Sequence, residues 1–323
     1  MNIETIYIEE EVLTHPRVVQ TCKRFANARK IIIERYAEVF NRKNQDFRSQ
    51  KEKSALILAK KHGEYLHKVP NNYGIGSKNN YYFSHLLNCP FDCQYCFLQG
   101  MYRSAHYVWF VNFEDFQTEI RKKEADTTFF SGYDGDSLAL ESVTHFAEEF
   151  LPFFERVKGT LELRTKSLFL RPLLERDAIP NVVIAFSLNP EEVVKSLEWR
   201  TPSLDKRLQA MEKLQKKGWK VGLRFDPLIA HENFEANMRA FFEKVFSSVQ
   251  KENLHSVTLG TIRLPKPFFR VMQKQHKKNK ALALLFKEEG LMGYPQQKRE
   301  SMIEFCTNEL LKFTQKEKLF ACA

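Results

Sequence analysis

The sequence contains little cysteine and glycine and no long apolar segment. Six of its 323 residues are cysteines and twelve are glycines. Six cysteines are too few for a disulfide framework in a chain that is long enough to bury a hydrophobic core of its own. No apolar run approaches the roughly 18 residues that a membrane-spanning helix needs. The composition therefore excludes disulfide-stapled and membrane-spanning proteins and indicates a globular protein.

The first residues also lack the features of a targeting segment. Residues 1–10 carry three glutamates, and no basic cluster precedes an apolar stretch. Neither a secretory signal nor an arginine-rich transit peptide is visible there. We therefore expect a cytoplasmic location and no membrane partner.

Acidic residues are outnumbered by basic ones. Fifty Lys and Arg residues stand against forty Asp and Glu residues, which gives a formal net charge of +10. An excess of this size favours a polyanionic partner without identifying it. A basic protein with no such partner is the alternative.

The pattern along the chain predicts three parts, which are an N-terminal arm or cap (1–70), a main domain (71–280) and a C-terminal extension (281–323). The arm combines an extended entry over residues 5–12 with a helical, charge-rich stretch over 16–61. In the extension, a helix is expected over residues 301–316.

The main domain alternates short apolar runs with longer amphipathic runs. The strand candidates are residues 81–87, 127–131, 161–165, 182–187, 221–225 and 256–259. Helices are expected over residues 113–123, 138–156, 168–176, 203–217 and 232–249. Such alternation indicates a parallel sheet with helices outside it, and six units suffice for a partial (β/α)6 barrel of the TIM type.

Three cysteines stand within eight residues, directly after the first strand candidate. Cys89, Cys93 and Cys96 have the spacing CxxxCxxC. A structural zinc site needs four ligands, and His85 or His106 could supply the fourth. Three thiolates can instead hold an iron–sulfur cube, with one iron left open to a small chelating ligand.

This motif, with Tyr95 and Phe97 on either side of its last cysteine, resembles the signature of the radical S-adenosylmethionine enzymes. The resemblance implies a [4Fe-4S] cluster on Cys89, Cys93 and Cys96, whose fourth iron is chelated by the amino and carboxylate groups of S-adenosylmethionine. Reductive cleavage of the sulfonium then gives a 5'-deoxyadenosyl radical. The usual fold of these enzymes is the barrel expected above.

The chain as a whole resembles the spore photoproduct lyase family. Similar elements recur in order at residues 6–9, 95–99, 165–166, 186–189, 203–207, 218–222, 227 with 231–232, and 266–267. The resemblance implies a lyase for DNA repair, which reverses a methylene-bridged thymine dimer and takes electrons from a reducing protein of the flavodoxin or ferredoxin type. A radical enzyme acting on RNA or protein, and a non-enzymatic zinc protein that binds nucleic acid, are the alternatives.

Two departures from the family stand out. Family members return a hydrogen from a cysteine at the end of the second strand, and an alignment anchored on Asp136 and Thr144 places Tyr133 at that position. A phenol can relay a radical but is a different donor from a thiol, so we expect Tyr133 and Tyr95 to be the catalytic residues. For Tyr95, packing against the cluster is the alternative. Where the family has a basic hairpin that inserts at the lesion, residues 288–300 keep two glycines and Tyr294.

Polar residues at the predicted strand ends are the candidates for binding S-adenosylmethionine, because barrel enzymes build their sites there. They are Asp134, Asp136, Ser137, Lys166, Ser187, Asn189 and Asp226. Each of these residues also has a structural alternative. Residues 134–137 could form a plain turn, and Lys166 could be an exposed lysine at a strand end. Residues 187–189 could start a helix, and Asp226 could form an ion pair with Arg224.

A basic segment after the last strand candidate is the expected contact with DNA phosphates. It comprises Arg263, Lys266, Arg270, Lys274, Lys277 and Lys278, interleaved with Phe268 and Phe269. A solvated charged face is the alternative, since most charge runs are of that kind.

Overall fold

A curled sheet of eight strands forms the centre of the molecule. The computed structural model describes residues 3–70, 73–276, 279–288 and 290–321. Six parallel strands lie side by side in chain order: β5 (Asn79–Phe83), β9 (Thr127–Ser131), β10 (Thr160–Thr165), β11 (Val182–Ser187), β13 (Lys220–Leu228) and β14 (Leu254–Thr261). They confirm the six strand candidates. A short β4 (His67–Lys68) pairs antiparallel with β5, and β18 (Leu319–Ala321) extends the other edge.

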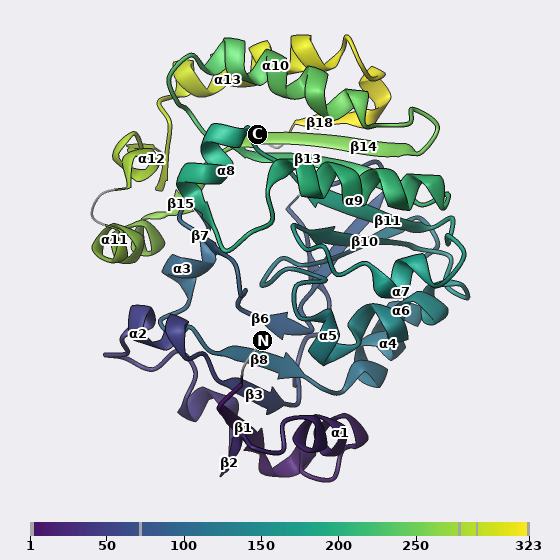
Figure 1. The fold of residues 1–323 in the computed structure, drawn as a ribbon, viewed down its shortest axis with the longest axis vertical. Helices are drawn as coiled ribbons and strands as arrows, with labels where there is room; N and C mark the ends of the chain where they lie inside the picture. The colour runs from purple at the N-terminus through teal and green to yellow at the C-terminus, as the bar shows by residue number, and fades with distance from the viewer. Residues whose placement is uncertain (1–2, 71–72, 277–278, 289, 322–323) are drawn as a thin grey trace.

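Helices cover the outer face of this sheet (Figure 1). They are α4 (Phe113–Arg121), α5 (Glu141–Thr144), α6 (Phe146–Phe154), α7 (Arg171–Leu174), α8 (Glu191–Leu197), α9 (Leu204–Lys216) and α10 (Phe234–Ser247). The single helix expected over residues 138–156 is wrong in one respect, because His145 adopts a left-handed φ of 51° and divides it into α5 and α6. A left-handed residue cannot continue a right-handed helix. The arrangement is the expected partial barrel.

The N-terminal part forms a sheet of its own, so its prediction as a helical arm is only partly correct. This sheet has the order β2 (Arg29–Ile33), β1 (Thr5–Glu9), β3 (Leu56–Ala59), β8 (Tyr107–Phe110) and β6 (Leu86–Leu87). The helical elements are α1 (Pro16–Arg24), α2 (Phe47–Glu52) and the 3-10 turns η1 (Glu10–Val12) and η2 (Tyr36–Glu38). The prediction missed β3 because a buried strand of four apolar residues has no period that distinguishes it from a helix turn.

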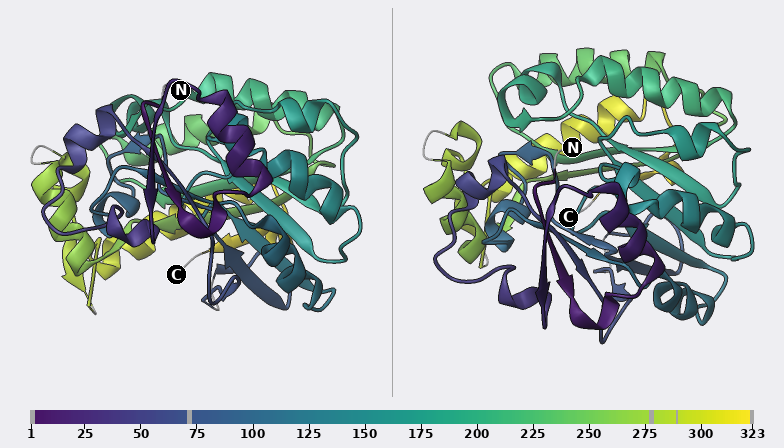
Figure 2. Two further views of the ribbon diagram at one scale, coloured as in Figure 1. Left: turned by 90° about the horizontal axis from the view of Figure 1, so that it is seen from below. Right: turned by 60° about the horizontal axis from the view of Figure 1, so that its bottom comes forward.

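The C-terminal part divides between two places: its first two helices lie on the same side of the molecule as α2, and its last helix packs beside α10 and β14 (Figure 1 and Figure 2). After β14 come β15 (Arg263–Pro265), α11 (Lys266–Gln275), α12 (Lys280–Ala283), β16 (Phe286–Glu288), β17 (Leu291–Gly293), α13 (Gln296–Leu310) and η4 (Lys316–Lys318). Strands β15, β17 and β16 form a small antiparallel sheet. Helix α13 confirms the expected C-terminal helix. The boundaries 1–70, 71–280 and 281–323 stay a prediction, and β8 and β18 each join a sheet from outside their own segment.

None of the described helices combines the length and the apolarity that a membrane crossing requires.

Candidate active site

The cysteine loop lies at the carboxyl end of β5, as the spacing predicts. Its middle part forms β7 (Asp92–Cys93), which pairs antiparallel with β12 (Glu198–Trp199), so that Cys93 lies opposite Glu198. The loop then leads into α3 (Leu98–Met101), which packs against α11. Segments far apart in the sequence therefore meet around the three thiols.

Side chains from other elements hold the backbone of this loop. The buried Lys51, on α2, donates from Nζ to the carbonyl oxygens of Cys89 at 2.7 Å and Phe91 at 3.0 Å. Asn279 donates from Nδ2 to the carbonyl oxygen of Gln94 at 2.9 Å. Buried carbonyl groups need such partners, so the loop has a defined shape. Sequence reasoning missed Lys51, which is one lysine in a charge-rich stretch and carries no motif.

The three thiols fit a [4Fe-4S] cluster. Cys93 is buried, Cys89 and Cys96 are half-buried, and none of them forms a disulfide. The ammonium groups of Lys51 and Lys166 interact electrostatically with the thiols. Three thiolates with two nearby cations suit a cube that carries negative charge and keeps one iron open.

The two histidines that could complete a zinc site are engaged elsewhere. The buried ring of His85 stacks on Phe146, with 3.7 Å between the ring centroids. His106 accepts a hydrogen bond at Nδ1 from the backbone nitrogen of Ala55 at 3.1 Å. Within the described ranges, no three or more His, Cys, Asp or Glu side chains, the three cysteines included, are grouped so that they could hold a single metal ion. An iron–sulfur cube differs from such a site, because each thiolate binds an iron of its own.

Tyr95 belongs to a buried polar network that joins the cysteine loop to the barrel. Its hydroxyl donates to the Glu198 carboxylate, and Asn189 donates from Nδ2 to Tyr95 Oη at 3.1 Å and to Glu198 Oε1 at 3.0 Å. Arg207 donates from Nη2 to Glu198 Oε2 and from Nη1 to the Ser187 carbonyl oxygen at 3.1 Å. The predicted residues Tyr95, Ser187 and Asn189 are therefore brought together, with Glu198 and Arg207 as unpredicted partners.

This network keeps Tyr95 protonated. Burial and the neighbouring Glu198 carboxylate raise the pKa of Tyr95 well above its ordinary value. Burial alone would raise the pKa of Glu198, but Lys166 and Arg207 hold it below its ordinary value. The Lys166 ammonium lies 5.7 Å from the centre of the Tyr95 ring. The Tyr95 hydroxyl therefore acts as a hydrogen-bond donor to an ionised carboxylate.

Asp134, Asp136 and Ser137 follow β9, and all three make structural contacts there. Asp136 Oδ1 accepts from Thr165 Oγ1 at 2.6 Å, and its Oδ2 accepts from the Lys166 backbone nitrogen at 2.6 Å. These two bonds tie the loop after β9 to the end of β10.

The other two residues of this loop are held in a similar way. Asp134 Oδ2 accepts from Ser84 Oγ at 2.5 Å. Ser137 donates from its backbone nitrogen to the Arg164 carbonyl oxygen at 3.0 Å, which closes the turn over the end of β10. For all three residues, the predicted contact with S-adenosylmethionine stays a prediction.

The inner face of the sheet is charged. Glu162 and Arg164 are two residues apart on β10 and so share one face, and Lys166 directly follows the strand. Arg224 on β13 donates from Nη2 to Glu162 Oε2 at 2.6 Å. Burial alone would raise the pKa of Glu162, but Arg224 and Arg164 lower it to about 2. Arg224 thus pairs with Glu162, where the sequence alternative had paired it with Asp226. Burial raises the pKa of Asp226, which interacts with Arg164 and Lys166.

Tyr133 lies beside the cysteine loop. Its side chain is 49% exposed, and its ring centroid lies 5.4 Å from that of Phe97 and 4.4 Å from that of Tyr82 on β5. The position expected for the hydrogen donor therefore faces the residue that follows Cys96. Tyr82 was not predicted, because one tyrosine in a strand gives no functional signal.

The basic segment forms β15 and α11. Arg270 and Lys274 are exposed, Lys266 is half-buried, and the Arg263 guanidinium lies 5.2 Å from the centre of the Tyr73 ring. Lys277 and Lys278 lie outside the described residues. Phe269, one of the two aromatic residues interleaved with these charges in the sequence, is buried. Its place on the apolar side of α11 explains the burial.

A hairpin follows this segment, although residues 288–300 keep few of the residues that the family's hairpin has. Strands β16 and β17 pair antiparallel, and Gly290 in the turn has a φ of 88°, which favours glycine. Phe286 is 59% exposed, and Leu291 is exposed as well. The hairpin therefore presents apolar side chains to solvent.

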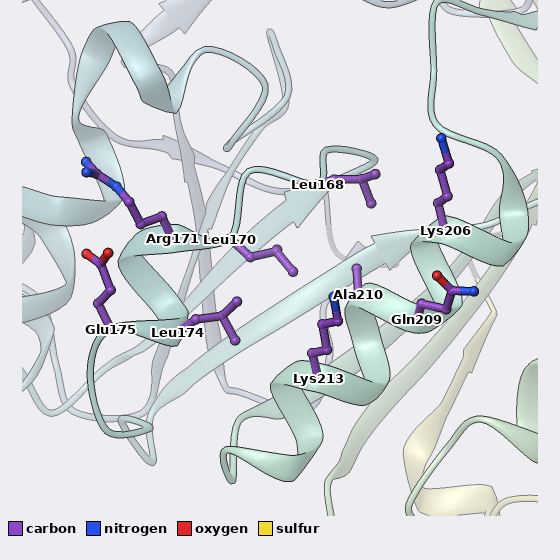
Figure 3. Close-up of a pocket in the computed structure, with 9 residues that line it drawn as sticks. All are labelled: Leu168, Leu170, Arg171, Leu174, Glu175, Lys206, Gln209, Ala210 and Lys213. Carbon is purple, nitrogen blue, oxygen red and sulfur yellow. The ribbon is translucent and has the colours of Figure 1, made fainter.

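A surface groove of about 420 Å³ lies between α7 and α9 (Figure 3). It is lined by Leu168, Leu170, Arg171, Leu174, Glu175, Lys206, Gln209, Ala210 and Lys213. None of the predicted site residues lines it, so the groove is separate from the candidate active site.

Comparison with known proteins identifies the family. The profile of the family described as "Spore photoproduct lyase" matches residues 3–289. The chain belongs to the spore photoproduct lyase family. Among curated members, it is 29% identical over 201 residues to the lyase of Bacillus subtilis (strain 168) and 27% identical over 201 residues to that of Geobacillus sp. (strain Y412MC61). Each alignment covers 59% of this chain and 59% of the relative.

Solved structures of the family share the fold. A lyase variant solved with bound AdoMet and dinucleoside spore photoproduct matches with a TM-score of 0.85 and 19% identity, covering 100% of this chain and 99% of that one. A second lyase variant matches with a TM-score of 0.84 and 19% identity over 100% and 99% of the two chains. The expected radical S-adenosylmethionine barrel is thereby confirmed as the fold.

Proposed function

We propose that this family member is a radical S-adenosylmethionine lyase that repairs a thymine-dimer lesion in DNA, with spore photoproduct as the first substrate to test. One observation carries the proposal: three thiols without disulfide partners lie in an anchored loop at the carboxyl end of β5. Membership of the lyase family and the fold shared with lyase structures support it.

In this proposal, Cys89, Cys93 and Cys96 hold three irons of a [4Fe-4S] cluster. When bound, the cluster and S-adenosylmethionine supply an electron and a carbon radical that abstracts hydrogen. The chain itself fixes the loop through Lys51 and keeps two ammonium groups near the thiolates. Burial raises the pKa of all three thiols, and these cations act against that rise by favouring the charged form.

S-adenosylmethionine would lie over the inner face of the sheet. Lys166 and Arg164 are suited to its carboxylate, and Asp226 is suited to its amino group, because these side chains surround the same part of the inner face. Asp134, Asp136, Ser137, Ser187 and Asn189 would shape the cavity from the neighbouring strand ends. For Asp136 and Asn189 this role is indirect, since their polar atoms already bind protein groups.

DNA would approach across the basic segment and the hairpin. Arg263, Lys266, Arg270 and Lys274 would contact phosphates, and Lys277 and Lys278 would extend the same charge. A lyase structure that contains dinucleoside spore photoproduct supports a DNA lesion as the substrate. The exposed Phe286 and Leu291 add apolar contact area that could pack against bases.

Tyr133 would return the hydrogen to the substrate after the thymine–thymine bond breaks. Its hydroxyl O–H takes the place of the family's thiol, and its ring contact with Phe97 puts it next to the cysteine loop. Electrons would come from a reducing protein of the flavodoxin or ferredoxin type. The cytoplasmic location stays a prediction.

The deciding experiment is anaerobic reconstitution followed by turnover with dithionite. We expect about four irons per chain and broad absorption typical of thiolate-bound iron. With S-adenosylmethionine and dinucleoside spore photoproduct, 5'-deoxyadenosine and thymine should form together. Undamaged DNA, RNA and a protein mixture serve as comparison substrates.

Matched cysteine variants make the test specific. Cys93→Ala should lose iron and turnover, whereas Cys22→Ala, a half-buried thiol on α1, should keep both. Stoichiometric zinc without iron would contradict the proposal. Formation of 5'-deoxyadenosine that only RNA or protein stimulates would move the activity to another substrate.

A further inference from the structure

Two residues at the end of the basic segment reach the cysteine loop. Asn279, which precedes α12, is buried and donates from Nδ2 to the carbonyl oxygen of Gln94 at 2.9 Å. His276, which ends α11, is also buried, and its Nε2 lies in hydrogen-bond contact with Oε1 of Gln99. The end of α11 therefore contacts the chain on either side of Cys96.

Gln99 links this contact to a second cysteine. It is buried and donates from Nε2 to the Cys93 carbonyl oxygen at 2.8 Å and to Asp92 Oδ1 at 2.9 Å. These two bonds use both hydrogens of the amide nitrogen. One side chain therefore separates the end of α11 from the backbone of a cysteine that is proposed to hold the cluster.

The helices α3 and α11 touch at a glycine. Gly100 lies on α3, four residues after Cys96, and α3 packs against α11 (Figure 1). A Cβ atom at position 100 would lie 2.4 Å from the Phe268 carbonyl oxygen and 2.6 Å from the Phe268 Cβ. Real Cβ atoms do not approach other heavy atoms so closely, so glycine is needed for α11 to lie directly on α3. The position of α11 thus fixes the position of α3.

The other side of α11 carries cations that the proposed function places on DNA phosphates. Arg270 and Lys274 are exposed and four residues apart, so they share one face of the helix. Phe269 and Met272 are buried on the opposite side. Helix α11 therefore lies between the proposed DNA contact and the cysteine loop.

We propose that α11 couples DNA binding to the shape of the cysteine loop. This inference rests on the DNA contact in the proposed function. Proteins open locally, and a ligand that binds only the closed state shifts the balance toward that state. Phosphates that contact Arg263 on β15 together with Arg270 and Lys274 would require α11 to lie on α3, and so would hold it there. Asn279 and Gly100 are then positioning residues for the cysteines.

Thermodynamic linkage makes the coupling reciprocal. If DNA stabilises the closed loop by some factor, a group held by the three cysteines raises the affinity for DNA by the same factor. Such couplings typically amount to about 5- to 150-fold. The coupling can therefore be measured from either side, and one of the two measurements needs no cluster.

Hydrogen exchange in the cluster-free full chain tests the loop directly. A short lesion-free DNA duplex is the probe, because phosphate contacts do not depend on sequence. At saturating duplex, the backbone amides of residues 92–100 should exchange about fivefold more slowly, whereas those of α9 should exchange at an unchanged rate.

Matched amide variants show whether this protection depends on the contact from α11. Asn279→Asp keeps the oxygen that caps α12 but removes the donor to the Gln94 carbonyl oxygen, and it should abolish the protection. Asn253 lies just before β14 and donates from Nδ2 to the Gln215 carbonyl oxygen at 3.1 Å. Asn253→Asp makes the same chemical change there and should leave the protection unchanged.

DNA affinity gives the reciprocal measurement. Fluorescence anisotropy under anaerobic conditions compares the cluster-loaded and cluster-free chains with one labelled duplex. Loading should raise the affinity about fivefold, and this ratio should fall to about one in Asn279→Asp. Gly100→Ala, which forces α3 and α11 apart without a change of charge, should lower the ratio in the same way. Because each ratio compares two forms of one variant, it cancels the direct effect of a new charge on DNA binding.

The outcomes separate this inference from the proposed function. Equal DNA affinity with and without the cluster, together with unchanged exchange over residues 92–100, would overturn the inference, whereas turnover with dithionite would still support the proposed function. Loss of the protection in Asn253→Asp as well as in Asn279→Asp would also overturn it, because a general loss of stability would then explain both. If the reconstituted chain holds no iron but the duplex protects the loop, the proposed function fails and the coupling stands. A duplex that binds neither form would contradict both.

Discussion

The cysteine loop and the loop after β9 meet at the same site, but their tyrosines, Tyr95 and Tyr133, are held in opposite ways. Side chains from α2, α3 and the segment before α12 hold the cysteine loop, and its Tyr95 is part of a buried network. The loop after β9 contains Tyr133, whose side chain is half exposed and makes ring contacts. The tyrosine next to the thiols is thus fixed, whereas the Tyr133 side chain is open to solvent, although its loop is tied to the end of β10.

This difference matches where the chain departs from its family. The cysteine spacing is kept in the cysteine loop, and the sequence predicts that Tyr133 stands in place of the family's hydrogen donor in the loop after β9. A side chain in a fixed, buried network cannot change without leaving partners unsatisfied. A half-exposed side chain can change at little cost in stability, so it is the easier place to alter a reaction.

The largest effect is expected from breaking the buried ion pair under the cysteine loop. Glu198 and Arg207 both have fully buried side chains. Glu198→Gln would leave the Arg207 charge without its partner, which costs about 3 to 5 kcal/mol. Urea denaturation should therefore show a large drop in the free energy of unfolding. Glu119→Gln, in the exposed pair with Lys122, is the control and should cost about 0.5 kcal/mol or less.

Acid should destabilise the inner face through Glu162. Its pKa is about 2 in the folded chain and about 4.5 ordinarily. Because the folded value is the lower one, the stabilisation is fully present above pH 4.5 and is lost as the pH falls through 2. The free energy of unfolding should fall with acid more steeply in the unchanged chain than in Glu162→Gln. Equal slopes would show that Glu162 is not ionised in its pair with Arg224.

Lys51 provides a smaller test of the fixed loop. Lys51→Met removes both hydrogen bonds to the loop carbonyls, and each unsatisfied buried group costs about 1 to 3 kcal/mol. We expect lower stability and less iron per chain after reconstitution. Lys53→Met, at an exposed lysine just after α2, should keep the iron content. Equal iron content in both variants would mean that the loop holds its shape without Lys51.

The sequence was sufficient to predict the barrel strands because buried parallel strands are continuous apolar runs. All six residues of β11 are buried, and so are all five of β9. In the N-terminal sheet, β1 lies in the extended entry expected over residues 5–12, but β2 and β3 were missed, because such strands pair with distant segments, as when β3 pairs with β8. No local pattern records such a pairing.

The same limit applies to the site. The cysteines were predicted from their spacing, and Tyr95 and Tyr133 from their place in the aligned chain. Lys51, Glu198 and Arg207 were missed, since each is a single charged residue whose partner lies on another element. A buried charge becomes visible only when the fold brings its partner to it.

Phosphate contacts on α11 should have a modest effect that does not depend on sequence. Arg270→Gln and Lys274→Gln each remove an exposed cation. If both contact phosphates, the slope of log affinity against log salt should fall by roughly 0.9 for each. Filter binding to a lesion-containing duplex over a range of salt measures this slope. Unchanged affinity and slope would make the exposed side of α11 a solvated charged face.

Substitutions of Tyr133 should have the smallest effect on stability, but they should clearly change the ratio of thymine to by-products. Tyr133→Phe and Tyr133→Cys change a half-exposed side chain, so the free energy of unfolding should move by about 0.5 kcal/mol or less. Tyr133→Phe removes the O–H and should lower the yield of clean thymine relative to by-products, because the substrate radical lives longer. Tyr133→Cys should raise that yield, since a thiol gives up hydrogen more readily than a phenol. Product analysis by chromatography measures the ratio, and clean repair that Tyr133→Phe leaves undiminished would show that the hydrogen returns by another route.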